Sequence, residues 1–334
     1  MPVCITGATG FIGAHITRSF LAAGINVRAA VRSPDKAAFL LELPGPGRLE
    51  VVVADLLRPE TWIGAIAGCE GLIHTAAHVV LASKDPERDI ITPAVEGTRA
   101  VLDAAARAGT VRRVVLTSSV AAVGGSRKAA TRPLTEADWN LEATIERAPY
   151  EVAKTREEQL AVELTQQHQQ WDLVTINPAM VLGPVLSPPH LKASPVVVRD
   201  ILLGRRGWLP DITTGVVDVR EVAAAHLAAW RHPSAYGRYI LSKCSVSVKE
   251  LSEMLARRYP ERGIRYRHVP KLLAALGGAF TPGLSVPVMW ELIGFNADFD
   301  GSRAVRELGV VYRELGETVA DTADSVLPHL RQVK

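Results

Sequence analysis

The sequence predicts an α/β protein with a doubly wound parallel sheet, because short β-rich runs alternate with longer helical patterns over its first 180 residues. Runs such as EVVVADL and RRVVLTSS are rich in apolar residues, which is typical of parallel strands buried on both faces. The strands expected from this pattern are 2–6, 26–31, 49–56, 71–77, 112–119 and 172–178. The helices expected between them are 11–24, 34–43, 59–67, 89–108 and 149–169.

A second, smaller region is predicted after Pro178, where the pattern becomes less regular. The segment GPVLSPPHLKASP contains four prolines and is expected to be a loop. A short strand followed by a helix is expected over 215–230, and another strand over 237–242. The predicted organisation is a first domain over 1–180, with segments around 215–242 returning to it, and a smaller α/β substrate lobe over 181–334.

The smaller lobe contains a predicted helix start and a long apolar stretch. Ser247 and Glu250 have the spacing of a capping box, which predicts that a helix begins there and continues to Tyr259. The stretch 272–295 is strongly apolar, but glycines, two prolines and a glutamate interrupt it. It is interpreted as lobe core or as a substrate lid, with contact to a membrane surface as a further alternative. No uninterrupted apolar run in the chain reaches the roughly 18 residues of a membrane-spanning helix, so no membrane span is expected.

Composition narrows the class of protein. The 334 residues include 38 Lys and Arg against 35 Asp and Glu, a net charge of +3 that is spread along the chain. This balance is too mild to indicate a nucleic-acid partner. Cys4, Cys69 and Cys244 lie far apart and lack the spacing of metal ligands, so no metal site is expected. Sparse cysteines fit a reducing compartment, and a strand predicted from residue 3 leaves no room for a signal peptide, so a cytoplasmic location is expected.

A glycine-rich loop follows the first expected strand. The segment TGATGFIG places Gly7, Gly10 and Gly13 between a strand and an amphipathic helix. Residues without Cβ allow a tight turn and a close approach of the backbone to a pyrophosphate, whose charge the helix N-terminus favours. The loop therefore predicts a dinucleotide-binding, Rossmann-type domain.

The ends of the next two strands indicate which dinucleotide binds. Where a carboxylate would hold the ribose 2′-hydroxyl of NAD, this chain has Val31 followed by Arg32, with Lys36 one turn later. A guanidinium can bind a 2′-phosphate bidentately, so NADP(H) is predicted over NAD(H); the alternative is that Arg32 is a solvent-facing strand end. Asp55, with the amide of Leu56, is a candidate to bind the adenine, or else a residue of a strand-terminal turn.

Six motifs taken together resemble one large family. They are TGATGFIG, ADL, HTAA, LTSS, YEVAK and NPAMVLGP. In this order they resemble an extended short-chain dehydrogenase/reductase, and the wording of VRSPDK, PAVEGT and VDVREVAAAH is most similar to the branch of dihydroflavonol reductases, cinnamoyl-CoA reductases and aldehyde and ketone reductases. The resemblance covers residues 2 to 242.

The resemblance implies three catalytic residues. Tyr150 is expected to donate a proton to the substrate carbonyl, and Lys154, one helical turn later on the same face, to favour its ionised form and hold the nicotinamide ribose. Ser119 is expected to bind the carbonyl oxygen, with Ser118 as the competing choice. The expected cofactor-binding residues are Gly7, Thr9, Gly10, Phe11, Ile12, Gly13, Arg32, Lys36, Asp55, Leu56, Thr75, Ala76, Ala77, Thr117, Tyr150, Lys154, Pro178 and Val181.

Departures from the family pattern bear on the substrate. Val123 stands where flavonoid-reducing members have an asparagine, which argues against a flavonoid. His78 follows the HTAA motif and is either a pocket residue or a loop residue without a role. His190 and Trp208 belong to the segment expected to cover the pocket, where Trp208 has lobe core as its alternative. With Ser119, these four are the expected substrate contacts.

The predicted activity is NADPH-dependent reduction of an aldehyde or ketone, a small-molecule carbonyl compound, to an alcohol. A 3β-hydroxysteroid dehydrogenase and a nucleotide-sugar epimerase or dehydratase share the Tyr and Lys spacing, but Arg32 weighs against their usual NAD. An NADP-binding redox sensor is the alternative that is not an enzyme, and the intact Ser119, Tyr150 and Lys154 argue against it. Proteins of this family are monomers or homodimers, and either state is compatible with the sequence.

Overall fold

The main sheet is parallel and has the strand order of a dinucleotide-binding fold. The computed structural model describes residues 1–77, 83–125, 132–204, 208–209, 212–278, 286, 290 and 298–330. Within these residues, seven strands pair in the order β10-β6-β5-β4-β1-β2-β3. They are β1 (Val3–Thr6), β2 (Val27–Val31), β3 (Leu49–Val53), β4 (Gly71–His74), β5 (Arg113–Thr117), β6 (Asp172–Pro178) and β10 (Gly237–Leu241). The order reverses between β1 and β4, so ligands are expected outside the carboxyl ends of these strands.

Helices cover both faces of this sheet, as the sequence predicted. Successive side chains of a strand point to opposite faces: Val3 and Ile5 of β1 join one hydrophobic core and Cys4 joins another. The first core contains residues of α1 and α7, which pack together, and the second contains residues of α3, α4 and α5. These helices are α1 (Phe11–Ala22), α3 (Glu60–Ile66), α4 (Thr92–Ala108), α5 (Pro149–His168) and α7 (Val219–Arg231), and a short α2 (Ala38–Leu41) follows β2.

Strand β3 differs from the expectation. The sequence predicted burial on both faces, but this strand is only partly buried and Val53 is 53% exposed. The reason is its position, because β3 lies at the edge of the sheet and pairs only with β2 among the described strands.

A second sheet lies beyond β6. Its order is β11-β9-β7, in which β9 runs parallel to β7 and antiparallel to β11. Its strands are β7 (Met180–Leu182), β9 (Thr213–Asp218) and β11 (Cys244–Ser247), and a small parallel pair joins β8 (Trp208–Leu209) to β12 (Arg267–His268). Of the segment predicted to return to the first domain, β10 pairs in the main sheet and α7 packs against it, whereas β9 belongs to this second sheet.

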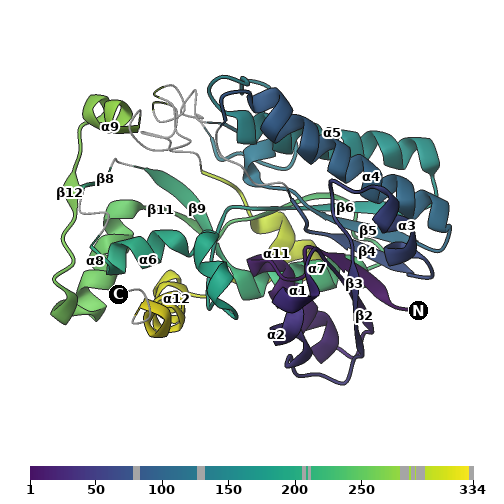
Figure 1. Ribbon diagram of the computed structural model, residues 1–334. Coiled ribbons are helices and arrows are strands. Elements are labelled where there is room, and N and C mark those ends of the chain that lie inside the picture. Colours follow the sequence, from purple (N-terminus) through teal and green to yellow (C-terminus); the bar gives the residue numbers. More distant parts are fainter. Residues whose placement is uncertain are drawn as a thin grey trace.

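Helices α6, α8 and α12 pack against one another beside the second sheet (Figure 1). The predicted capping box at the start of α8 is present: Ser247 accepts from the N–H of Glu250, whose carboxylate accepts from the N–H of Ser247. The bounds of these three helices are α6 (Val196–Leu202), α8 (Val248–Arg258) and α12 (Leu315–Leu330), and two further helices of this region are α9 (Lys271–Gly278) and α11 (Ser302–Leu308).

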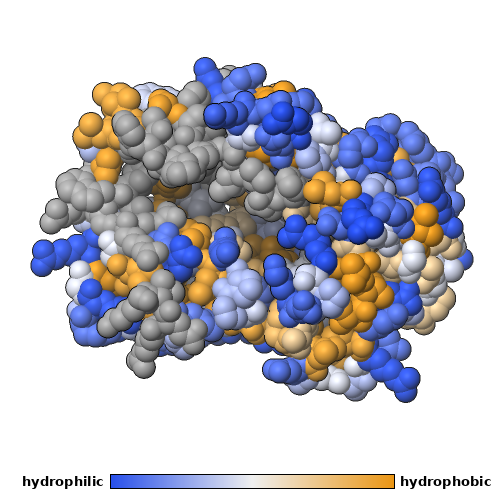
Figure 2. All heavy atoms as spheres, in the orientation of Figure 1, coloured by the Kyte–Doolittle hydropathy of each residue, from blue (hydrophilic) through white to orange (hydrophobic). Residues whose placement is uncertain are grey.

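The apolar stretch 272–295 is described only through Gly278 and at Val286 and Trp290. In α9 the side chains of Leu272 and Leu273 are each 60% exposed, and Figure 2 shows apolar residues gathered there on the surface. The described leucines of α9 therefore do not lie in a lobe core, whereas most of the stretch lies outside the described residues, so its role as lobe core or lid stays a prediction. Within the described part of the chain, no helix is long and apolar enough to cross a membrane.

Candidate active site

The glycine loop lies at the carboxyl end of β1 and opens helix α1. Gly7 has φ +64°, a left-handed conformation, and an added Cβ would lie 2.8 Å from the backbone of Ala76. An added Cβ at Gly13 would collide with the carbonyl of Gly7. No side chain caps α1 and its first turn holds no acidic residue, so the first N–H groups of α1 are free to bind an anion.

A group of uncharged side chains lies under this loop, and we call Thr6, His74, Thr75 and Thr98 the neutral cluster. Thr6 Oγ1 accepts from the N–H groups of Thr75 and Ala76 at 3.0 Å each, so its own proton goes to His74 Nδ1 at 2.8 Å. His74 Nε2 therefore carries the ring proton and donates to Thr98 Oγ1 at 3.3 Å. Burial lowers the pKa of His74 from 6.5 to about 3, so this ring is neutral at physiological pH.

The predicted 2′-phosphate residues follow β2. Val31 is buried, whereas Arg32 and Lys36 are exposed. Among the described residues, no side chain forms a hydrogen bond or ion pair with either cation. Both are therefore available to an anionic ligand.

Asp55 and Leu56 follow β3. One carboxylate oxygen of Asp55 accepts from the N–H of Leu57 at 3.0 Å, so this residue holds the strand-terminal turn that the sequence offered as its alternative role. Leu56 packs on α4, so closely that a Cβ added at Gly97 would lie 3.1 Å from the Cβ of Leu56. The structure leaves the adenine contact as a prediction.

Tyr150 and Lys154 lie in the first turns of α5, where Pro149 is the first helical residue. Tyr150 is half-buried and the side chain of Lys154 is 8% exposed. Lys154 Nζ donates to Glu157 Oε2 at 2.7 Å. Burial by itself lowers the pKa of Lys154, but attraction to Glu157 and Tyr150 outweighs it and the pKa lies above its ordinary value. The lysine is therefore a buried cation.

The two candidate serines after β5 have different surroundings. Ser118 is buried and donates to Glu158 Oε2 at 2.6 Å, which uses its only proton. Ser119 Oγ accepts from the N–H of Ala121 at 3.1 Å, and its own proton goes to no acceptor among the described residues. This difference favours Ser119 over Ser118 as the hydrogen-bond donor to a substrate oxygen.

An ion pair lies under these serines, and we call Ser118, Glu158, Asn177 and Arg238 the charged cluster. Glu158 is 0% exposed; its carboxylate accepts from Arg238 Nε at 2.6 Å and from Asn177 Nδ2 at 2.8 Å. Asn177 Nδ2 also donates to the carbonyl of Ser119 at 3.2 Å. The cluster therefore joins α5, β6 and β10 directly under Ser119.

A further residue joins the start of α5 to the turn after Ser119. Asn140 Nδ2 donates to the carbonyl of Ala121 at 2.8 Å and to Glu151 Oε2 at 2.7 Å. Helix α5 also packs against the 3₁₀ turn Val120–Ala122. The structure thus brings the Ser119 turn and the Tyr150 helix into contact.

Three other predicted cofactor residues lie around this edge of the sheet. The Oγ1 of Thr117 donates to His226 Nε2 at 2.8 Å, because His226 Nδ1 donates to the carbonyl of Val222. Among the described residues, no group donates a hydrogen bond to Thr117 Oγ1, so this oxygen can accept one from a ligand. Pro178 ends β6 and Val181 lies in β7, and both are buried.

His190 is corrected as a substrate residue, because it is 2% exposed and both ring nitrogens are occupied. Its Nδ1 accepts from the N–H of Leu186 at 3.2 Å, so its Nε2 donates to the carbonyl of Thr9 at 3.1 Å. The ring also packs between Phe11 and Phe39. His190 therefore links the 3₁₀ turn Pro188–Lys192, which follows the main part of the sheet in sequence, to the glycine loop by a hydrogen bond.

The prediction that Val123 contacts the substrate is corrected as well. Val123 is 1% exposed and packs in an apolar cluster with Val120, Ala179, Ile240 and Phe299, which leaves no surface for a substrate. The backbone of Trp208 lies in β8, but its side chain and the whole of His78 lie outside the described residues.

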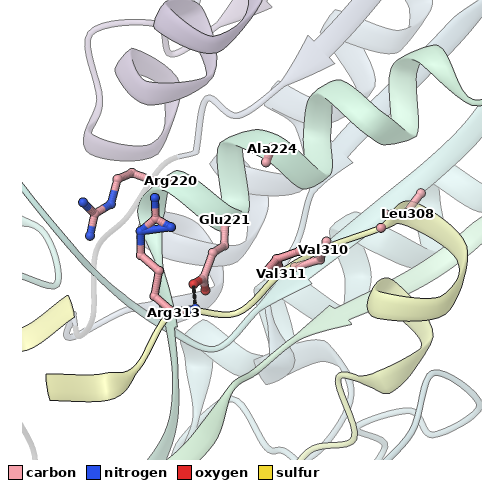
Figure 3. A pocket seen from close by; sticks show the side chains of 8 residues that line it. Arg220, Glu221, Ala224, Leu308, Val310, Val311 and Arg313 are labelled. Carbon is pink, nitrogen blue, oxygen red and sulfur yellow. Dashed lines mark hydrogen bonds between the residues drawn. The ribbon is translucent and has the colours of Figure 1, made fainter. Parts of the chain in front are cut away.

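A small cavity of about 260 Å³ opens elsewhere, between α7 and the segment after α11 (Figure 3). Glu221 accepts there from the backbone N–H of Arg313, and Arg220 is paired with Asp218 and Asp321. None of the predicted catalytic or cofactor residues lines it. The cavity is therefore not the site that the sequence predicted.

Sequence reasoning did not identify Glu157, Glu158 or Arg238. For the two glutamates a signal was present, since residues three and four positions after Lys154 share its helix face. Arg238 follows Glu158 by 80 positions, and no local pattern links them.

Comparison with known proteins places this arrangement in a family. The model of the NAD dependent epimerase/dehydratase family matches residues 3–241. The chain belongs to this family. This match and the relatives described next confirm the resemblance to extended short-chain dehydrogenase/reductases of the dihydroflavonol and cinnamoyl-CoA reductase branch, and they confirm the fold.

Similar family members are reductases. A cinnamoyl-CoA reductase of Medicago truncatula is 36% identical over 77% of this chain and 81% of its own length. A dihydroflavonol 4-reductase of Zea mays is 34% identical, covering 79% and 76%. The structure of yeast methylglyoxal/isovaleraldehyde reductase Gre2 complexed with NADPH superimposes with a TM-score of 0.81 at 27% identity, covering 99% of this chain and all of that one.

Proposed function

We propose that this protein reduces an aldehyde or ketone to an alcohol with NADPH, and that Tyr150 is the proton donor. The observation that carries the proposal is the buried ammonium of Lys154, one helical turn from Tyr150 and beside the turn that presents Ser119. The reductases among its relatives support the reaction class, and their different substrates have only a carbonyl group as the common feature.

The residues present fit a bound dinucleotide phosphate. The backbone space at Gly7 and Gly13 exists because these residues have no Cβ, which would otherwise fill it. The first turn of α1 offers uncapped N–H groups to a pyrophosphate. Arg32 and Lys36 would hold the 2′-phosphate, and Lys154 the nicotinamide ribose. When bound, the cofactor supplies the hydride.

Side chains of the protein stabilise the charge that develops on the carbonyl oxygen and supply the proton that this oxygen receives. Ser119 donates a hydrogen bond to the carbonyl oxygen as negative charge develops there. Tyr150 transfers its phenolic proton to the same oxygen, so the product leaves as an alcohol. The positive charge of Lys154 stabilises the phenolate that remains.

A panel of aldehydes, ketones and β-keto esters, followed by loss of NADPH absorbance, tests this function. We expect turnover with at least one class, and a loss of about a hundredfold or more in kcat for Tyr150→Phe with NADPH binding retained. Near-parental rates in that variant would exclude the mechanism. NADPH binding without oxidation by any carbonyl would instead favour a sensor.

The choice of cofactor is tested separately. Arg32→Asp would place a carboxylate beside the 2′-phosphate, so the Michaelis constant for NADPH should rise about tenfold or more while that for NADH falls or stays the same. Lys192→Asp, a charge reversal at a lysine outside the predicted cofactor set, serves as the control. Equal use of both cofactors by the parent protein would contradict the proposal.

A further inference from the structure

The ion pair between Lys154 and Glu157 has no place in the mechanism above. The ammonium and the carboxylate are 2.7 Å apart, and the side chains are only 8% and 7% exposed. They are three positions apart on α5, so the helix itself sets their spacing. Charged side chains are seldom buried without a partner, and among the described residues Glu157 alone accepts a hydrogen bond from this ammonium.

Other charged or titratable groups face Lys154 from several elements. Tyr150 and Glu158 lie on the same helix, and His74 of β4 is close enough for the lysine charge to lower its pKa further. The carboxylate of Glu158 is already committed to Arg238 of β10 and to the rest of the charged cluster. His74 is neutral. Among the described residues, the carboxylate next to the lysine that is paired with no other cation is therefore that of Glu157.

We propose that Glu157 is a positioning residue of the candidate active site, whose carboxylate fixes the Lys154 ammonium and keeps it charged in its buried environment. The inference rests on the proposed function, because it assigns Glu157 a role through Lys154. Glu157 itself is not expected to touch substrate or cofactor.

The donor count of the ammonium supports this role. An ammonium has three N–H donors and no acceptor. Glu157 takes one of them, which leaves two for a ribose diol or the oxygen of Tyr150. A carboxylate on one side thus directs the remaining donors to the other side, and a long flexible side chain is held in one conformation before the cofactor arrives.

The charge balance supports it as well. Burial disfavours a charged lysine and can lower its pKa by several units. Here the attraction of Glu157 is the largest of the effects that oppose burial, and the pKa of Lys154 is raised. A folded pKa above the ordinary value means that the charge is retained to higher pH. Loss of the Glu157 charge would let the lysine become neutral at lower pH.

Two substitutions separate charge from position. Glu157→Gln keeps an oxygen that can accept from the ammonium but removes the charge. We expect the alkaline limb of the kcat profile for carbonyl reduction to move down by about one pH unit or more, with the Michaelis constant for NADPH nearly unchanged at neutral pH. Glu157→Ala removes both functions, so the same shift should be accompanied by a higher Michaelis constant for NADPH.

The control is Glu163→Gln, the same chemical change at an exposed position of the same helix, which should leave the profile in place. A profile of Glu157→Gln that coincides with that of the parent would overturn the proposal. So would variants that lose thermal stability while their pH profile stays in place, because a merely structural residue behaves in that way.

A second readout does not need turnover. Binding of NADPH, followed by its fluorescence as a function of pH, should weaken at lower pH in Glu157→Gln than in the parent, because the ammonium that contacts the ribose loses its proton earlier. Identical binding profiles would refute the role of Glu157. Absence of turnover in the parent, with shifted binding, would refute the reductase function and leave the role of Glu157 standing.

Discussion

The charged cluster and the neutral cluster lie under two parts of one sheet edge, and they are built differently. Under Ser119, Glu158 and Arg238 form a fully buried ion pair. Under the glycine loop, Thr6 and His74 make only uncharged hydrogen bonds. A fixed neutral layer adds no charge where an anionic pyrophosphate is expected, whereas an ion pair binds strands and helix tightly where the reacting groups must be placed.

The largest effect should follow from breaking the ion pair. Arg238→Met would leave Glu158 buried without its cation, so we expect a loss of about 3–5 kcal/mol in the free energy of unfolding, measured by denaturant titration. The matched variant with both Arg238→Met and Glu158→Leu should regain much of this loss. If the single variant were as stable as the parent, the distinction between the two clusters would fail.

A smaller effect is expected from the neutral cluster. Thr6→Val preserves shape but leaves the N–H groups of Thr75 and Ala76 and the Nδ1 of His74 without their partner. We expect a loss of about 1–3 kcal/mol in the free energy of unfolding, by the same measurement. Thr17→Val, which removes a buried hydroxyl bonded to one helical carbonyl, is the control and should cost less.

The free energy of unfolding should depend on pH because His74 of the neutral cluster titrates differently in the folded and unfolded chains. The pKa of His74 is about 3 in the folded protein and 6.5 ordinarily, so the unfolded chain binds more protons between these values. Stability should therefore fall as the pH falls from 6.5 towards 3, and His74→Gln should reduce the slope by up to about 1.4 kcal/mol per pH unit. The exposed His232→Gln is the control; equal slopes for the two variants would argue against a buried neutral His74.

The smallest effect, a change in NADPH affinity, should follow from removing the hydrogen bond between His190 and the glycine loop. His190→Ala removes the bond to the carbonyl of Thr9, so the dissociation constant for NADPH should rise about two- to tenfold, measured by fluorescence titration. His329→Ala on α12 is the control. An unchanged constant would show that the loop keeps its shape without His190.

Much of the fold was predictable because the main sheet and the helices that cover it are built from local patterns. The strands at Val3–Thr6, Val27–Val31 and Asp172–Pro178 and the helix from Pro149 all begin or end within a residue or two of their expected positions. Exposure of β3 was not predictable, because a run of valines is the same at the edge of a sheet and in its middle. The assignment of β9 to a second sheet depends on pairing with β7 and β11, which sequence spacing does not reveal.

The candidate site was predictable in part for a related reason. Tyr150, Lys154 and the glycine loop have fixed local spacings, so their placement follows from one helix and one turn. His190 and Val123 were assigned from a segment and from a family position, and only packing shows that both are buried. Arg238 was missed because its partner is remote in the sequence.

The pairing of Glu158 with Arg238 has a consequence for the order in which the protein matures. Glu158 is made 80 residues before its partner, and strand β10, which carries Arg238, is the last in sequence of the described strands of the main sheet. During synthesis the nascent first domain must hold a carboxylate that cannot be buried favourably until this strand emerges. The support under Ser119 is thus completed only when β10 docks, so a chain cut short before Gly237 should be unable to assemble a competent site.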